Sequence, residues 1–131
     1  MIEMMRDEGL LCVYSVSRRL AFNEKLPGNH LSRCLGDWLE GISDWLEKNG
    51  FVVGHLKILV AAEGEMDRLS ITKGYVSRNP SPEWPDTLVR ALDLYVTLIA
   101  FGPDEDAFQR EASRRMTSLC FDEMVQHMGA S

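Results

Sequence analysis

The chain has few cysteines and histidines, and none of the spacings that form redox pairs or metal sites. Its three cysteines, Cys12, Cys34 and Cys120, are odd in number and far apart among 131 residues. No C-x-x-C, H-x-x-x-H or H-E-x-x-H pattern is present. Because dithiol and zinc sites use such close spacings, the sequence predicts no metal. In a reducing compartment isolated cysteines are usually small buried hydrophobes, and we expect the same here.

Long apolar runs and phosphate-binding glycine loops are also lacking. Even the long apolar run near Ile58–Ala62 is much too short to cross a bilayer. The first residues, M-I-E-M-M-R-D-E-G, place acidic groups where a secretory signal needs a basic start and an apolar run. The ten glycines are dispersed, and neither G-x-G-x-x-G nor G-K-S/T occurs. The sequence therefore predicts a cytoplasmic protein with no membrane contact and no cofactor.

Positive charge is in the minority. The chain has 14 basic and 20 acidic residues, a net charge of −6, and such a surface repels phosphate backbones. We therefore expect no nucleic-acid partner. Hydrophobic residues make up 45% and charged residues 26%, which is an ordinary globular balance. A length of 131 residues fits a single domain, residues 1–131, with frayed ends at 1–9 and 129–131.

Residues 51–76 carry the clearest structural signal. Two apolar, β-branched arms are joined by a short acidic segment with one glycine, E-G-E-M, which predicts a β-hairpin. Pairing Ala62 with Asp67, across a four-residue loop at 63–66, keeps polar side chains off the core face. In that register one face of the hairpin carries the apolar residues Leu56, Ile58, Val60, Leu69 and Ile71.

Two segments have the apolar spacing of amphipathic helices. The first, Leu31–Lys48, follows Asn29 as a possible N-cap and ends at Asn49-Gly50, a left-handed C-cap pair. The second, Asp104–Met128, opens with three carboxylates that complement the helix dipole. Each helix has a single apolar stripe, so we expect both to pack on the one apolar face of the hairpin.

The remaining segments are extended or irregular. Residues 88–101 are apolar on both faces, which predicts a central strand. Residues 10–22 fit either a strand or a helix, with the strand favoured by β-branched residues. Residues 23–28 resemble a turn, and three prolines in 77–86 predict an extended loop. The predicted fold is α+β: a small antiparallel sheet of three or four strands with two amphipathic helices packed on one face, in the order β(?)-α-β-β-β-α.

The non-core face of the hairpin is the candidate ligand site. In the derived register it carries the polar side chains His55, Lys57, Arg68, Ser70 and Thr72. A histidine, two cations and two hydroxyls suit a small anion or acid–base chemistry. The simpler interpretation is a solvated polar face. No carboxylate on this face orients the histidine, so the sequence identifies no catalytic residue.

The same side of the sheet is also the candidate interface. With both helices on one face, the other carries Leu59, Tyr95, Ile99 and Phe101, and Trp84 stands in the proline loop. Monomers seldom expose large apolar patches, and two-fold dimers dominate soluble oligomers. If residues 10–22 formed a helix, that helix would be an alternative cover. We therefore expect a homodimer, or a complex with another protein.

These patterns favour one function and leave a second open. The first is a small cytoplasmic accessory or regulatory protein that acts through protein–protein interaction and self-associates. The alternative is a small-molecule-binding domain or an enzyme that uses the non-core sheet face around His55 and Lys57. The sequence does not decide whether the protein is an enzyme.

Overall fold

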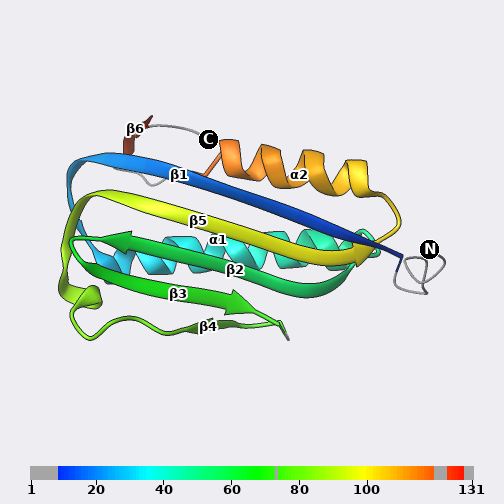
Figure 1. The fold of residues 1–131 in the computed structure, drawn as a ribbon, viewed down its shortest axis with the longest axis horizontal. Coiled ribbons are helices and arrows are strands. Elements are labelled where there is room, and N and C mark those ends of the chain that lie inside the picture. The colour runs from blue at the N-terminus through cyan, green and yellow to red at the C-terminus, as the bar shows by residue number, and fades with distance from the viewer. Residues whose placement is uncertain (1–8, 73, 120–123, 129–131) are drawn as a thin grey trace.

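The computed structural model describes residues 9–72, 74–119 and 124–128, which form an antiparallel sheet and two helices (Figure 1). In chain order the elements are β1 (Leu10–Pro27), α1 (Gly28–Lys48), β2 (Val52–Ala62), β3 (Glu65–Ile71), β4 (Val76–Arg78), β5 (Leu88–Gly102), α2 (Glu105–Thr117) and β6 (Met124–Met128). A short 3₁₀ turn, Trp84–Asp86, lies in the proline-rich segment before β5.

The sheet has six strands in the order β4-β3-β2-β5-β1-β6, and every neighbouring pair is antiparallel. β5 lies between β1 and β2, as expected for a strand that is apolar on both faces. Since β1 and β2 both run antiparallel to β5, they are parallel to each other and are joined through α1. The α+β class is confirmed. The strand count and order differ from the prediction, because β4 and β6 add short strands.

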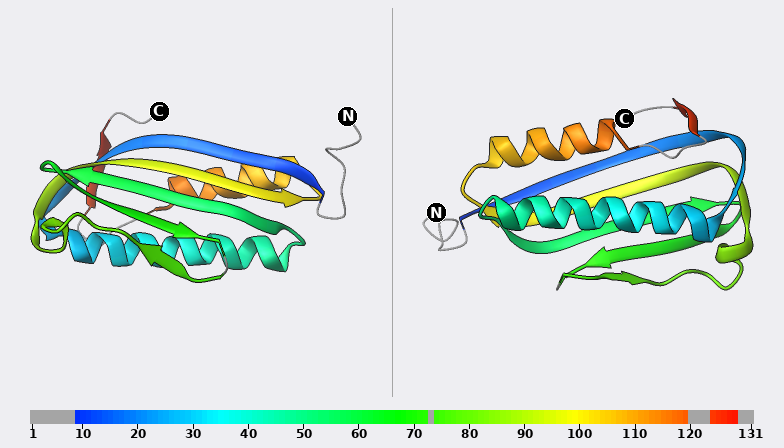
Figure 2. Two further views of the ribbon diagram at one scale, coloured as in Figure 1. Left: turned by 60° about the horizontal axis from the view of Figure 1, so that its bottom comes forward. Right: turned by 180° about the vertical axis from the view of Figure 1, so that it is seen from behind.

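Both helices lie against the same side of the sheet, as the view from behind shows (Figure 2). The two helices are linked where Trp38 Nε1 of α1 donates to the Arg115 carbonyl oxygen of α2 at 3.0 Å. The core is one layer between helices and sheet, because side chains of a strand alternate between its faces. Its largest fully buried members are Trp84, Phe108, Leu20, Leu31, Leu35, Leu39, Leu46, Leu56, Ile58, Leu69 and Ile71.

The hairpin register differs from the prediction by two residues. Ala62 pairs with Glu65 and Val60 with Asp67, so the loop is the two-residue turn Glu63–Gly64 and not a four-residue loop. Both turn residues have positive φ, 56° and 78°, the conformation of the type I′ turns that match strand twist. A shift of two preserves the faces, so the five apolar residues predicted for the core face are indeed buried.

The first strand is longer than predicted. Residues 10–22 form a strand, and it continues through residues 23–27, where a turn was expected, with an irregularity between Ala21 and Leu26. The helix that follows begins at Gly28 with Pro27 as N-cap, and no side chain caps it. Asn29, the predicted cap, accepts a hydrogen bond from Arg78 instead. The predicted helix end is correct: Gly50 has φ 83° directly after the C-cap Asn49.

The C-terminal helix is shorter than predicted. Asp104 is its N-cap and accepts from the Ala107 amide at 3.0 Å, but the helix ends at Thr117 and not at Met128. Residues 124–128 form β6, which pairs with β1 at residues 19–22. Residues 120–123 lie outside the described residues, and so do the predicted frayed ends, 1–9 and 129–131, except for Gly9. Of the cysteines, Cys12 is buried and Cys34 half-buried, while Cys120 lies outside the described residues.

Replacing either of two glycines in α1 by alanine should change the unfolding free energy, with opposite sign at the two positions. A Cβ on Gly28 would lie 2.1 Å from the Trp84 carbonyl oxygen, so we expect Gly28→Ala to lower the unfolding free energy by more than about 2 kcal/mol. A Cβ on Gly36 would meet Leu69 at an ordinary 3.7 Å, so Gly36→Ala should raise it by about 0.5–1 kcal/mol through helix propensity. Urea titration measures both. Equal effects of the two variants would contradict the packing of Trp84 on the start of α1.

Candidate functional site

One side of the sheet carries no helix. We call this side the open face, and among the described residues no element lies over it (Figure 1). Its side chains include Leu11, Val13, Ser15 and Ser17 of β1, Tyr95, Thr97, Ile99 and Phe101 of β5, Val52, His55, Lys57 and Leu59 of β2, and Arg68 and Ser70 of β3. The most exposed apolar members are Tyr95 (48%), Val52 (47%), Val13 (44%) and Leu11 (38%).

A row of small polar residues crosses the open face. In the observed register Ser15 pairs with Thr97, Thr97 with Lys57, Lys57 with Ser70, and Ser70 with Ser77. We call these five residues the hydroxyl row. It spans β1, β5, β2, β3 and β4, and the Ser15 and Thr97 hydroxyl oxygens lie 3.3 Å apart within it. Because four of its five members are serine or threonine, the side chains of this row rise less far above the sheet than those of the neighbouring rows.

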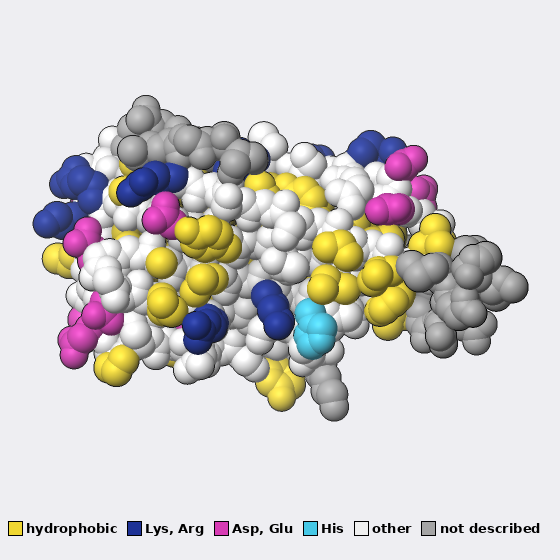
Figure 3. All heavy atoms as spheres, viewed as in Figure 1, with side chains coloured by type: hydrophobic (Ala, Val, Ile, Leu, Met, Phe, Trp, Pro, Cys, Tyr) yellow, Lys and Arg dark blue, Asp and Glu magenta, His cyan; other side chains and the backbone are white. Residues whose placement is uncertain are grey.

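The neighbouring rows carry larger side chains. On one side lie Tyr95, Leu59 and Arg68, and on the other Ile99 and His55. The low row between tall rows leaves a hollow of about 500 Å³ towards the β3 and β4 side of the face. Figure 3 views this face: hydrophobic side chains form separate groups at its two ends, with basic side chains between and below them.

The hollow is electropositive. Lys57, Arg68 and Arg78 line it, and no described residue that lines it is acidic. Arg78 is paired with the buried Asp67, whereas none of the ion pairs that join described residues includes Lys57 or Arg68. On this side of the sheet Asp93 lies near Arg19 at 3.6 Å and forms an exposed pair with it. Two cations without a carboxylate partner are an unusual local feature in a chain of net charge −6.

The structure brings together three of the five predicted ligand residues. Lys57, Arg68 and Ser70 line the hollow. His55 is on the same face, one row away, and Thr72 is exposed beyond the end of β3; neither lines the hollow. The sequence did not identify Ser77 and Thr97 as part of the site, because their place beside Lys57 depends on the register of β4 and β5.

Four of the five predicted interface residues share the open face. Leu59 and Tyr95 line the hollow, and Ile99 and Phe101 lie further along β5. Trp84, the fifth candidate, is different: its side chain is 0% exposed inside the chain's own core, so its assignment to an interface is corrected. An irregularity at Val53–His55 also puts Val53 against the core and Val52 on the open face.

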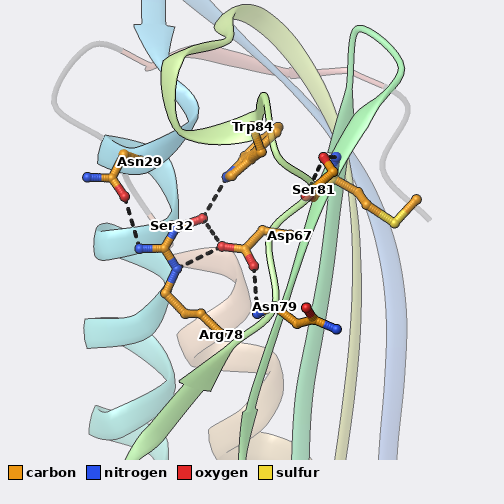
Figure 4. A network of polar contacts seen from close by, with 8 residues as sticks. Asn29, Ser32, Asp67, Arg78, Asn79, Ser81 and Trp84 are labelled. Atoms are coloured by element: carbon orange, nitrogen blue, oxygen red, sulfur yellow. Dashed lines mark hydrogen bonds and ion pairs between the residues drawn. The ribbon is translucent and has the colours of Figure 1, made fainter.

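Trp84 belongs to a buried polar network that joins four segments (Figure 4). Its indole Nε1 donates to Ser32 Oγ at 2.9 Å, and Ser32 Oγ donates to Asp67 Oδ2 at 2.6 Å. Arg78 Nε donates to the same carboxylate oxygen at 2.8 Å, and the Asn79 amide donates to Asp67 Oδ1 at 3.2 Å. The carboxylate is fully buried and has three donors, so its hydrogen-bonding needs are met.

This network has the features of a structural connection and not of a reaction centre. Asp67 has no exposed surface, and Ser32 is buried as well, so a substrate has no access to either. The network ties β3 to the start of α1, to β4 and to the proline-rich segment. The sequence does not reveal this network, because the predicted register pairs Asp67 with Ala62 at the end of the hairpin, whereas Asp67 pairs with Val60.

Other reactive groups in the described part of the chain form no site. Burial raises the pKa of the Cys12 thiol, which disfavours the nucleophilic thiolate. Nowhere in that part do three His, Cys, Asp or Glu side chains come together as a metal would require. No helix there is both long and apolar enough to cross a membrane.

Comparison of the chain with protein-family models, with curated protein sequences and with solved structures gives no match.

The Asp67–Arg78 pair gives an asymmetric stability prediction. Arg78→Gln leaves a fully buried carboxylate without its cation and should cost about 3–5 kcal/mol. Asp67→Asn should cost less, because the Arg78 side chain keeps 31% of its surface exposed and can turn towards water. Urea titration measures both, with Arg110→Gln, an exposed cation on α2, as the control for lost charge. A larger loss for Asp67→Asn than for Arg78→Gln would contradict this account.

Proposed function

We propose that the protein is a small cytoplasmic accessory or regulatory protein that acts through protein–protein interaction, and that it forms a homodimer through the open face. The observation that carries this proposal is the one-sided architecture: both helices lie on the other side of the sheet. Four apolar side chains on the open face are more than a third exposed. Covering them removes apolar surface from water, which favours association.

The size of the open face supports a stable interface. Four strands about 4.8 Å apart, shared over about ten residues of about 3.3 Å each, give a footprint of roughly 600 Å². Stable complexes bury about 800 Å² of accessible surface per partner. A face covered with side chains has more accessible surface than its footprint, so the two areas are of the same order.

The sheet edges are less suited to association. Where β4 ends, the proline-rich segment continues along the outer edge of β3. There the backbone amide of Asn79 donates to the Arg68 carbonyl oxygen at 2.9 Å, and the amide of Ser81 donates to the Met66 carbonyl oxygen at 2.8 Å. At the other edge, Gln109 Nε2 of α2 donates to Val13 O of β1 at 2.8 Å. Edge groups that already have partners are poor templates for strand addition. The open face is therefore the better candidate.

The pattern on the open face suits a second copy of the same chain. A two-fold axis parallel to the strands, between β2 and β5, places Leu59 of one copy on Tyr95 of the other. The same axis places Lys57 opposite Thr97 and Arg68 opposite Ser17, so like charges do not face each other. Sheets that pack face to face keep their strands roughly aligned, as this arrangement requires.

The proposal predicts a dimer that a single charge disrupts. Sedimentation equilibrium at micromolar concentration should report twice the 14.9 kDa mass of one chain. Phe101→Lys should shift the population towards monomer, because a lysine in a face-to-face interface must lose its water. Tyr75→Lys is the matched control, since Tyr75 is 68% exposed in the β3–β4 loop and outside the rows of the open face. A monomeric wild type, or equal effects of both variants, would refute this interface.

A further inference from the structure

We propose that the hollow on the open face binds the phosphate group of a small phosphorylated molecule. In this site Lys57 and Arg68 neutralise the phosphate, and Tyr95 and Leu59 contact the apolar or ring portion of the ligand. The hollow is complete within one chain, so the proposal does not depend on the dimer.

The charge of the hollow favours an anion. Two cations that lack carboxylate partners among the described residues line the same space, and no acidic residue in the described lining competes with a ligand. Arginine recognises oxyanions with parallel N–H donors, and lysine binds phosphate as a point charge. The negative net charge of the whole chain opposes long polyanions such as nucleic acid, because their charge extends beyond the hollow. A small ligand avoids that repulsion.

The hydroxyl groups favour phosphate over a carboxylate. Ser70, Ser77 and Thr97 lie in the same lining as the two cations, and each hydroxyl can donate a hydrogen bond. A carboxylate has two oxygens, whereas a phosphate monoester has three terminal oxygens and a charge of about −1.5 to −2 at neutral pH. Two cations and three hydroxyls therefore match the larger number of acceptors.

The size of the hollow and its apolar border indicate what the ligand carries besides its phosphate group. A volume of about 500 Å³ falls within the range of small-molecule sites and exceeds what a bare phosphate fills. Tyr95 borders the hollow with nearly half of its surface exposed, so a ring or an apolar group can stack on it without rearrangement. Leu59 pairs with Tyr95 across β2 and β5 and extends the apolar side.

Isothermal titration with inorganic phosphate, AMP and adenosine tests the proposal. We expect AMP to bind more tightly than phosphate, and adenosine to bind least. Lys57→Gln and Arg68→Gln should each weaken AMP binding about tenfold or more, as the loss of one charge-assisted hydrogen bond does. Lys25→Gln and Arg110→Gln remove the same charge at exposed positions outside the hollow and should leave the affinity unchanged.

A steric variant separates the hollow from charge in general. Ser70→Leu keeps both cations but fills the space between them, so it should abolish AMP binding while thermal melting shows a folded protein. Repeating the titration on Phe101→Lys makes the result independent of the dimer. The added charge lies four residues from Thr97, about 13 Å along β5, and is screened at physiological salt.

Three outcomes would overturn the proposal. The first is no binding of phosphate or AMP at millimolar concentration. The second is adenosine binding as tightly as AMP, which would remove the role of the phosphate. The third is equal loss of affinity in the hollow variants and in Lys25→Gln or Arg110→Gln. Each outcome is judged on Phe101→Lys as well as on the wild type, and sedimentation measures the oligomeric state of both separately.

Discussion

The position of β5 is the constraint on which the rest of the structure depends. This strand pairs with both β1 and β2, so its register fixes which residues of those two strands lie side by side. Its even-numbered side chains from Leu92 to Ala100 are buried under the helices, and the odd-numbered ones from Tyr95 to Phe101 therefore point to the open face. One alternating segment thus determines both the core and the candidate site. The hydroxyl row exists because Thr97 stands between Ser15 and Lys57.

The buried Asp67 carboxylate holds the strands that β5 does not contact, β3 and β4. β3 and β4 pair with each other over only a short length, from Leu69 to Ile71 of β3, yet they form one wall of the hollow. Asp67 fixes them to α1 through Ser32 and Arg78. Burying a charge is costly unless it is paired and fully hydrogen-bonded, and here three donors satisfy it. We infer that the network positions Ser77 beside Ser70, since its members Arg78 and Asn79 follow Ser77 directly and line the hollow themselves.

Local patterns predicted the parts of this fold that depend on local physics. The core face of the hairpin, the end of α1 at Asn49-Gly50, and the central place of β5 all follow from alternation, capping and apolarity within one segment. The errors have non-local causes. The contact of Asp67 with Ser32 joins residues 35 apart in the sequence, and Trp84 packs on the distant Gly28, so no pattern within one segment predicts either. The hydroxyl row needs the registers of five strands at once, so only Lys57, Arg68 and Ser70 were found.

The two proposals use the same surface, and thermodynamics links them. In a dimer through the open face, Lys57 and Arg68 of each copy would lose water on association, which disfavours the interface unless their charge is compensated. The hydroxyls of Thr97 and Ser17 opposite them compensate in part.

A phosphate in the hollow would neutralise both cations before association and lower that cost. Provided the ligand fits between the two sheets, it would then tighten the dimer, and by reciprocity the dimer would bind the ligand more tightly than the monomer does. A ligand that protrudes above the rim of Tyr95 and Leu59 would have the opposite effect, because it would hold the two sheets apart. The depth of the hollow, set by the small side chains of the hydroxyl row, therefore determines the sign of the coupling.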